Sequence, residues 1–447
     1  MAELLDIATR VAGWANAGEQ LEAFVVHETE TDVRAYNGAV ESFTRAESRG
    51  IGVRVIVDGK QGYAYAGTLD EDALSETLRE ARDNASFAEP DEFNGLATPD
   101  DVGFADLDLW SDDFASFTTD EKVALAIELE RLTLDANPLV SGVESAEYVD
   151  MAYESAVATS TGIAATGRGT GCYVSTHSMA ERDGETQTGF GFSLGRDPRG
   201  LDPAAAARDA GERATRLLGG TKPASERLTV VLDPFVTAQF LGIVGHTLTG
   251  DAVLKGRSMF ADRLGDAVAA SSITLVDDPT NADAFTAGIV DGEGLATRRV
   301  PLIVDGELQA FLHNAYSGRR AARPSTGSAV RGGFKSGPGV GAQALALTPG
   351  DRSPADLIAG IDNGFLVQGV AGLHSGVNPV SGDFSTGAEG LRIRNGEVAE
   401  PIREVTIAST LQRLLHDIEG IGNDLEWLPM SAAGVSLVVA DVTMSGA

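Results

Sequence analysis

The sequence predicts an α+β protein with two domains. Three observations support this: the 447-residue chain is too long for one compact core, its apolar residues change between helical and strand periods, and Asp-Gly or Asn-Gly pairs separate several apolar runs. The polar segment Lys222–Ser225 lies between a predicted helix and a new strand. We therefore expect an N-terminal α+β domain over residues 1–222 and a C-terminal β-rich domain over 223–447.

The first domain is expected to begin with a helix over 3–16, where apolar residues recur with a period of about 3.6. An antiparallel meander should follow over 21–66, because its segments alternate and Asp58-Gly59 is typical of a hairpin turn. Further helices are predicted over 70–88, 118–137 and 203–218, a surface loop over 88–116, and strands over 143–149, 153–160, 171–179 and 186–194.

The second domain is predicted to be a glycine-rich, mainly antiparallel sheet or barrel with a few helices. Its strands begin with "LTVVLD" at 228–233, and one is expected to run through the segment that contains His313. Asp305-Gly306 and Asn395-Gly396 predict two more hairpins.

Composition excludes several classes of partner and location. Lys and Arg number 34 against 66 Asp and Glu, so the net charge of -32 disfavours direct contact with nucleic acid or an anionic membrane surface. A single cysteine, Cys172, permits neither an internal disulfide nor a Cys-based zinc knuckle. The acidic amino terminus is unlike a signal peptide, and no apolar run reaches about 18 residues. We expect a soluble, cytoplasmic protein.

The six histidines limit the search for a metal or catalytic site. His27, His177, His313 and His416 lack partners at ligand spacing and are interpreted as structural. His374 lies in a predicted loop rich in turn residues, where either a structural or a functional role is open. His246, in "LGIVGHTLTGD", is a candidate metal ligand. A zinc peptidase helix needs a second imidazole and a glutamate near it, however, and the upstream positions here are apolar.

Five segments occur along nearly the whole chain in one order: "ESFTRAESRGIGVRVIVDGKQGYA", "AVATSTG", "GHTLTGD", "DGEGLATRRVPLIVDGELQAFLHNAYSGRRA" and "GVNPVSGDFSTGAEGLRIRNGEVAEPIREVTIASTL". Together they resemble the TldD/PmbA family, also called modulators of DNA gyrase. The resemblance implies a peptidase system in which a metallated member, TldD, acts with a paralogue called TldE or PmbA on flexible peptides.

Metallated members of that family carry His-Glu-x-x-x-His, a following Gly-Asp and a later cysteine ligand. On this chain the resemblance places Leu241 at the first ligand, Gly242 at the general base and His246 at the last histidine. Cys172 lies upstream of the motif and cannot replace the missing cysteine. We therefore expect no catalytic residue, no metal ligand and no cofactor in this chain, with Leu241, Gly242 and His246 as a vestige of the metal motif.

Three functions follow as hypotheses. The first is a non-catalytic, TldE-like subunit of a heteromeric metallopeptidase, whose zinc is held by a TldD-like partner and whose substrate is an unfolded peptide. The second is a self-sufficient hydrolase with a site near His246, Asp251, His374 and Asp383. The third is a homodimeric scaffold or regulatory protein.

A glycine-rich loop in the second domain is expected to line a peptide chamber beside a free strand edge. Its candidate residues are His374, Gly376, Asn378, Gly382 and Asp383.

Overall fold

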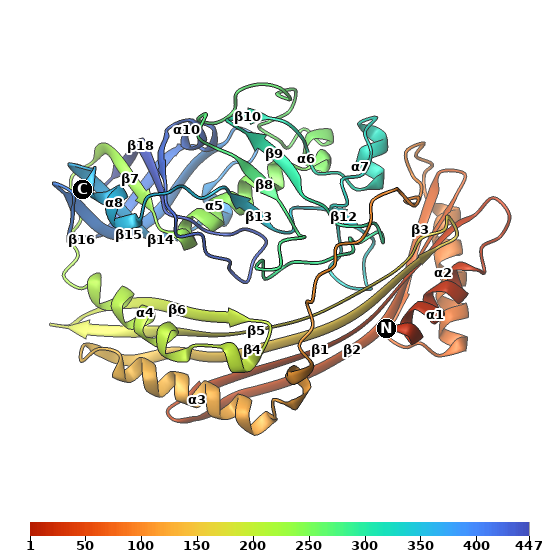
Figure 1. Ribbon diagram of the computed structural model, residues 1–447, viewed down its shortest axis with the longest axis horizontal. Coiled ribbons are helices and arrows are strands. Elements are labelled where there is room, and N and C mark those ends of the chain that lie inside the picture. The colour runs from red at the N-terminus through yellow and green to blue at the C-terminus, as the bar shows by residue number, and fades with distance from the viewer. Residues whose placement is uncertain (447) are drawn as a thin grey trace.

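The protein has an α+β fold in which a long curved sheet lies beneath a β-rich second half (Figure 1). The computed structural model describes residues 1–446. The α+β class and the antiparallel sheets predicted from the sequence are confirmed. Within the described residues, no helix has the length and apolarity needed to cross a bilayer.

A six-stranded antiparallel sheet with the order β3-β2-β1-β4-β5-β6 forms most of the first half. Tight turns at Asn37-Gly38, Asp58-Gly59 and Asp183-Gly184 join neighbouring strands, and both residues of each pair have positive φ, as a type I′ turn requires. Asp58-Gly59 is therefore confirmed as a hairpin turn. The strands are β1 (Gln20–Tyr36), β2 (Ala39–Val57), β3 (Lys60–Ala66), β4 (Val140–Thr159), β5 (Ala164–Arg182) and β6 (Glu185–Gly195).

The strands of this sheet are longer than the sequence pattern indicates. We expected separate strands over 143–149 and 153–160, but β4 is continuous. The apparent break is Asp150, a buried carboxylate that interrupts the apolar alternation. Lys122 Nζ lies 2.5 Å from Asp150 Oδ2, and the Tyr148 hydroxyl donates to the same oxygen at 2.7 Å. These partners allow a charged residue to face the core without ending the strand.

Four helices pack on the first sheet. They are α1 (Ala2–Ala12), α2 (Glu71–Phe87), α3 (Thr119–Asp135) and α4 (Pro203–Arg216), with short 3-10 turns at Asp112–Ser116 and Pro198–Gly200. Thr118 and Glu121 form a reciprocal capping box that fixes the start of α3. In Figure 1, α1, α2 and α3 lie on the side of the sheet that faces away from the second half.

The segment predicted as a surface loop over 88–116 is instead a partly buried strap between the halves. Leu96, Leu109 and Phe114 are buried along it. The Arg319 guanidinium, from the second half, donates to the carbonyl of Phe93 at 2.7 Å and to that of Leu96 at 3.2 Å. Because its backbone groups find these partners, the segment needs no regular secondary structure to be ordered.

The second half is built around a closed ring of strands. The sheet order is β16-β15-β14-β7-β18-β17, and an added β16–β18 pairing closes the ring. Only the β14–β7 pair is parallel among these ladders. The predicted hairpin at Asn395-Gly396 joins β15 to β16. The strands are β7 (Glu226–Leu232), β14 (Asn363–Ala371), β15 (Asp383–Arg394), β16 (Glu397–Thr410), β17 (Ile418–Ile421) and β18 (Leu437–Ser445).

Smaller elements surround this ring. The predicted hairpin at Asp305-Gly306 joins β9 (Val300–Val304) to β10 (Glu307–Leu308). His313 was expected on a strand, but it lies just before α7, whose N-cap is the next residue, Asn314. The other elements are β8 (Leu275–Asp277), β11 (Ala329–Val330), β12 (Gly339–Val340), β13 (Leu345–Leu347), α5 (Pro234–Thr247), α6 (Gly250–Leu254), α7 (Ala315–Arg320), α8 (Pro354–Ala359), α9 (Leu373–Gly376) and α10 (Leu411–His416).

A buried ion cluster joins the two halves. Arg54, from β2, lies 2.6 Å from Glu22 of β1 and 3.5 Å from Glu293 of the second half. Arg331 also pairs with Glu22. Burial raises the pKa of the Glu22 carboxyl, but the two guanidinium groups outweigh it and hold that pKa below its ordinary value. Glu22 therefore stays charged, and its ion pairs with Arg54 and Arg331 link the two halves.

Candidate functional site

Helix α5 carries His246 and is positioned from its first residue. The Asp233 carboxylate caps it by accepting from the Phe235 N–H at 2.8 Å, and Pro234 occupies the first helical turn. Asp233 Oδ2 also lies 2.8 Å from Arg213 of α4, so the same residue ties the helix to the first half. Most of α5 is buried in the largest apolar core, which explains its nearly uniform hydrophobicity.

A cavity of about 510 Å³ lies against the exposed face of α5. His246 and Gly242 are both exposed and lie one helical turn apart on this face. Leu241, in contrast, is 2% exposed and packs in the core on the other side of the helix. Of the three positions assigned to the metal motif, the structure brings Gly242 and His246 to the cavity and directs Leu241 away from it. The cavity is lined by Ala238, Gln239, Gly242, Ile243, His246, Leu373, His374, Val377, Pro379, Met430, Ser431 and Ala432.

The predicted chamber loop contributes to this cavity through His374. That residue lies in the short helix α9 rather than in an irregular loop, and it is exposed. Leu373, Val377 and Pro379 line the cavity beside it. The segment thus lines the same cavity as His246, and sequence reasoning did not single out three of its four lining residues, Leu373, Val377 and Pro379.

The other predicted loop residues shape the segment and do not line the cavity. Asn378 Oδ1 accepts from the N–H groups of Val380 at 2.9 Å and Ser381 at 3.2 Å. The Ser381 hydroxyl donates to Asp383 Oδ2 at 2.7 Å. Gly382 has a φ of +82°, which favours glycine. These residues form the turn that leads into β15.

Two glycines of this loop are constrained, Gly376 by contact with backbone and Gly382 chiefly by its positive φ, because the Gln412 side chain beside Gly382 is flexible. A Cβ atom on Gly376 would lie 2.4 Å from the Ser385 carbonyl oxygen, and one on Gly382 would lie 1.9 Å from Gln412 Oε1. Bulky substitutions there would distort the loop. Variants at either glycine therefore change the local structure as well as any contact with substrate.

Chemically, the cavity offers imidazole, amide and hydroxyl groups but no carboxylate or thiol. Asp251, a candidate partner of His246, instead lies 2.9 Å from Lys255 Nζ and does not line the cavity. A catalytic zinc takes three protein ligands and leaves a position for water, and a general base stands nearby. Among residues 1–446, no three His, Cys, Asp or Glu side chains gather closely enough to hold a metal ion. The residues present do not fit a catalytic metal.

A second hollow of about 430 Å³ continues along α5, since Gln239 lines both spaces. It includes Phe190 of β6 and Phe235 of α5, whose ring centroids are 4.4 Å apart, and the half-buried Glu389. Sequence reasoning missed Gln239, although it shares a helical face with Gly242 and His246. It also missed Met430–Ala432, which no periodic pattern marks.

Models of one protein family match nearly the whole chain. Residues 21–85 match domain 1 of the PmbA/TldA metallopeptidases, residues 112–218 the central domain, and residues 225–446 the C-terminal domain. The chain belongs to the PmbA/TldD family. The resemblance inferred from the sequence is therefore confirmed, and most of the strap before α3, residues 88–111, lies between the first two matched ranges.

Relatives and solved structures agree with this membership. The chain is 26% identical over 429 residues to the metalloprotease PmbA of Escherichia coli O157:H7, covering 95% of this chain and 92% of that protein. It is 33% identical over 219 residues to a metalloprotease of Methanothermobacter thermautotrophicus, covering 48% of this chain and 47% of that one.

Among solved structures, TldE from Thermococcus kodakarensis has a TM-score of 0.89 at 22% identity, covering 96% of this chain and 97% of that one. A Thermotoga maritima protein described as a candidate modulator of a DNA gyrase has a TM-score of 0.90 at 23% identity, covering 99% of this chain and 100% of that one. At these identities the likeness establishes a shared fold.

Proposed function

We propose that this PmbA/TldD-family chain is a non-catalytic, TldE-like subunit of a heteromeric metallopeptidase that cleaves unfolded or flexible peptides. The observation that carries the proposal is the cavity on α5, where His246 and His374 meet no carboxylate or thiol. Without a third ligand and a general base, the chain lacks the groups that activate water in a metallopeptidase. Zinc is then expected in a TldD-like partner.

In this proposal the role of the chain is to bind the peptide substrate. The cavity wall is mainly apolar, through Ile243, Leu373, Val377 and Met430, and suits the side chains that an unfolded segment exposes. The ring closure reduces the free strand edge that we expected in the second half, because each of the five ring strands has a neighbour on both sides within the described residues. Strand β16 pairs with β18 only over Thr406–Ala408, however. β6 ends the first sheet instead, and its Phe190 reaches the adjoining hollow.

The proposed partner is a metallated paralogue, with self-association as the alternative where no paralogue is present. The net charge of -32 supports a protein partner rather than direct nucleic-acid contact or a membrane surface. The lone Cys172 is buried and suits a reducing compartment, so we place the complex in the cytoplasm.

The test is to purify the chain with and without a metallated family member, then measure zinc per chain and hydrolysis of an unstructured peptide. We expect no stoichiometric zinc and no hydrolysis by the chain alone, and zinc-dependent hydrolysis by the pair. Zinc bound by the chain alone and lost in His246→Ala would instead support the self-sufficient hydrolase. A homodimer that does not alter the paralogue's activity would support the scaffold.

A matched pair of variants tests whether the cavity holds substrate. His374→Trp places a bulky ring in the cavity, whereas His416→Trp makes the same change at another exposed histidine, at the end of α10. The first is expected to reduce peptide turnover by the assembled pair while complex formation is unchanged. Equal turnover in the two variants would remove the cavity from the substrate path.

A further inference from the structure

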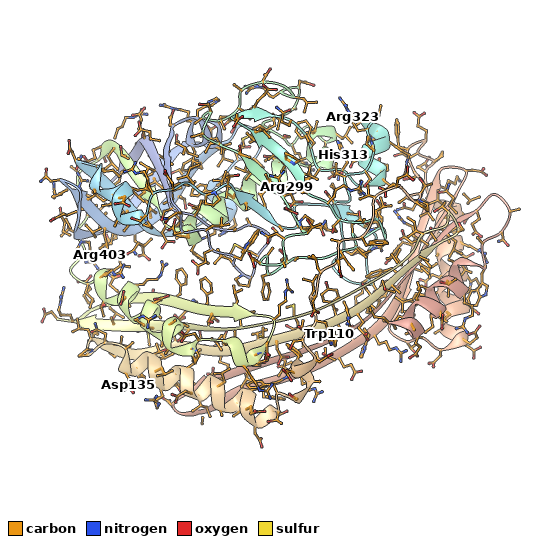
Figure 2. The ribbon with its side chains drawn as sticks, in the orientation of Figure 1. Trp110, Asp135, Arg299, His313, Arg323 and Arg403 are labelled. Atoms are coloured by element: carbon orange, nitrogen blue, oxygen red, sulfur yellow. The ribbon has the colours of Figure 1, made fainter. Side chains whose placement is uncertain are left out.

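A separate cavity of about 410 Å³ lies beside α6 and α7 and shares no lining residue with the cavity on α5. Figure 2 shows His313 and Arg323 near each other, on the side of the second half that faces away from the long sheet. The cavity is lined by Gly250, Val253, Leu254, Asp262, Leu264, Gln309, Ala310, Phe311, His313, Ala321, Arg323, Pro324 and Thr326.

His313 lines this cavity and is only 6% exposed. Its backbone N–H donates to Thr326 Oγ1 at 2.8 Å, and its Nδ1 lies 3.3 Å from Ser317 Oγ. A Cβ on Gly250 would lie 2.2 Å from Nδ1, so α6 packs directly against the ring. Burial and then the charge of Arg323 lower the pKa of His313, which keeps the imidazole neutral. Among residues 1–446, its Nε2 has no hydrogen-bond partner.

Arg323 places a positive charge at the rim of the same cavity. Its side chain is exposed and makes no ion pair within the described residues, although the chain carries nearly twice as many acidic as basic residues. The preceding Ala322 has a φ of +52°, a conformation that is costly for alanine and fixes the direction of the chain at this point. Asp262 also lines the cavity and is exposed, and it forms no ion pair with Arg323.

The remaining wall is largely apolar, through Val253, Leu254, Leu264 and Phe311. Leu264 is 45% exposed, so part of this wall is open to solvent. A cavity of this volume, with apolar walls and a few fixed polar groups, is typical of sites for small ligands.

We propose that this cavity binds a carboxylate attached to a compact apolar group. Arg323 contacts the carboxylate, and the apolar wall takes the attached group. His313 donates its Nε2–H to the carboxylate in the tautomer whose Nδ1 accepts from the Ser317 hydroxyl. Two sources supply this chemistry: the C-terminal end of a short peptide with an apolar last residue, or a free short-chain monocarboxylic acid. The proposal does not depend on the chain being a peptidase subunit.

The test is calorimetric titration of the full chain with three probes: N-acetyl-Ala-Leu as the free acid, the same dipeptide as its C-terminal amide, and hexanoate. Arg323→Gln removes the charge at an exposed position. Arg299→Gln is the matched control, because Arg299 is also exposed, lies outside the cavity and makes only a 3.8 Å pair with Asp278. Val253→Phe fills the cavity, with thermal unfolding used to confirm that each variant folds.

At least one of the two acids is expected to bind, and Arg323→Gln should weaken that binding by at least about tenfold, while Arg299→Gln changes it by less than about twofold. Val253→Phe should weaken it as well. Binding of the peptide acid but not hexanoate identifies a peptide end as the source, and the reverse identifies a free acid. The proposal would be overturned if the peptide acid bound and its amide bound equally well, if the affinity were unchanged in Arg323→Gln, or if neither acid bound at about 5 mM.

Discussion

Histidines introduced at adjacent positions of α5 test which face of the helix borders the cavity. Gly242 is exposed, and a Cβ there would meet nothing within 4 Å. It precedes His246 by four residues, so Gly242→His places two imidazoles on one helical face, with Cβ atoms about 5–6 Å apart. Leu241→His places the ring in the core instead. We expect zinc binding from the first variant and none from the second.

The two variants should also differ in stability. Gly242→His removes a glycine from a helix interior and should stabilise the fold by a few tenths of a kcal/mol, about 0.3–0.5. Leu241 is 2% exposed. Its replacement loses apolar contacts and buries a polar ring, at a cost of about 3–5 kcal/mol in the free energy of unfolding.

The assay is zinc titration by calorimetry at neutral pH, together with urea unfolding of the metal-free proteins. Wild type and Gly242→Ala serve as controls. Zinc binding by Gly242→His should disappear when His246→Ala is added. The assignment of the helix faces would be wrong if Leu241→His bound zinc through His246 and kept wild-type stability. Gly242→His would in that case bind no zinc and would be destabilised.

Three further predictions concern buried charged and reactive groups. Arg54→Met leaves Glu293 without its cation and weakens the pairing of Glu22, so urea unfolding should show a loss of about 3–5 kcal/mol. Burial raises the pKa of Asp277 to about 6, and two backbone amides bind one carboxylate oxygen while the other has no partner. The pKa of Asp277 in the folded state exceeds its value in the unfolded state, so the protonated carboxyl favours folding. This contribution to stability is present below about pH 4 and is lost as pH rises through 6. Asp277→Asn should remove that loss and raise stability at pH 8 by at most about 3 kcal/mol; an unchanged pH profile would contradict the assignment. Burial raises the pKa of Cys172 to about 12, so a thiol reagent at pH 8 should label it only after unfolding, and rapid labelling of the native protein would refute this.

Local sequence signals predicted most of the elements. Asp58-Gly59, Asp305-Gly306 and Asn395-Gly396 each form the expected hairpin, because both residues of each pair adopt the positive φ that such turns need. Thr118 and Glu121 likewise cap α3, since capping depends only on neighbouring residues. The chain's family could also be recognised from five sequence segments that occur in the order typical of the family.

Long-range partners could not be predicted. The strap residue Leu109 is buried against Ala284 and Ala344, which are distant in the sequence, so its polar surroundings indicated a surface loop. Asp150 appeared to interrupt a strand because its partner Lys122 lies on another element. At the candidate site, the motif alone did not show which of Leu241 and Gly242 faces the cavity. The burial of α5 shows that Leu241 faces the core and Gly242 faces the cavity.

The central claim is that this chain supports peptide cleavage only through a metallated partner. Its most direct test is the rate of hydrolysis of one unstructured peptide while this chain is titrated into a fixed amount of a metallated PmbA/TldD-family member. The account predicts no rate for this chain alone and a rise that saturates at a fixed ratio of the two chains. Hydrolysis by this chain alone, removed by a chelator and by His246→Ala, would contradict it.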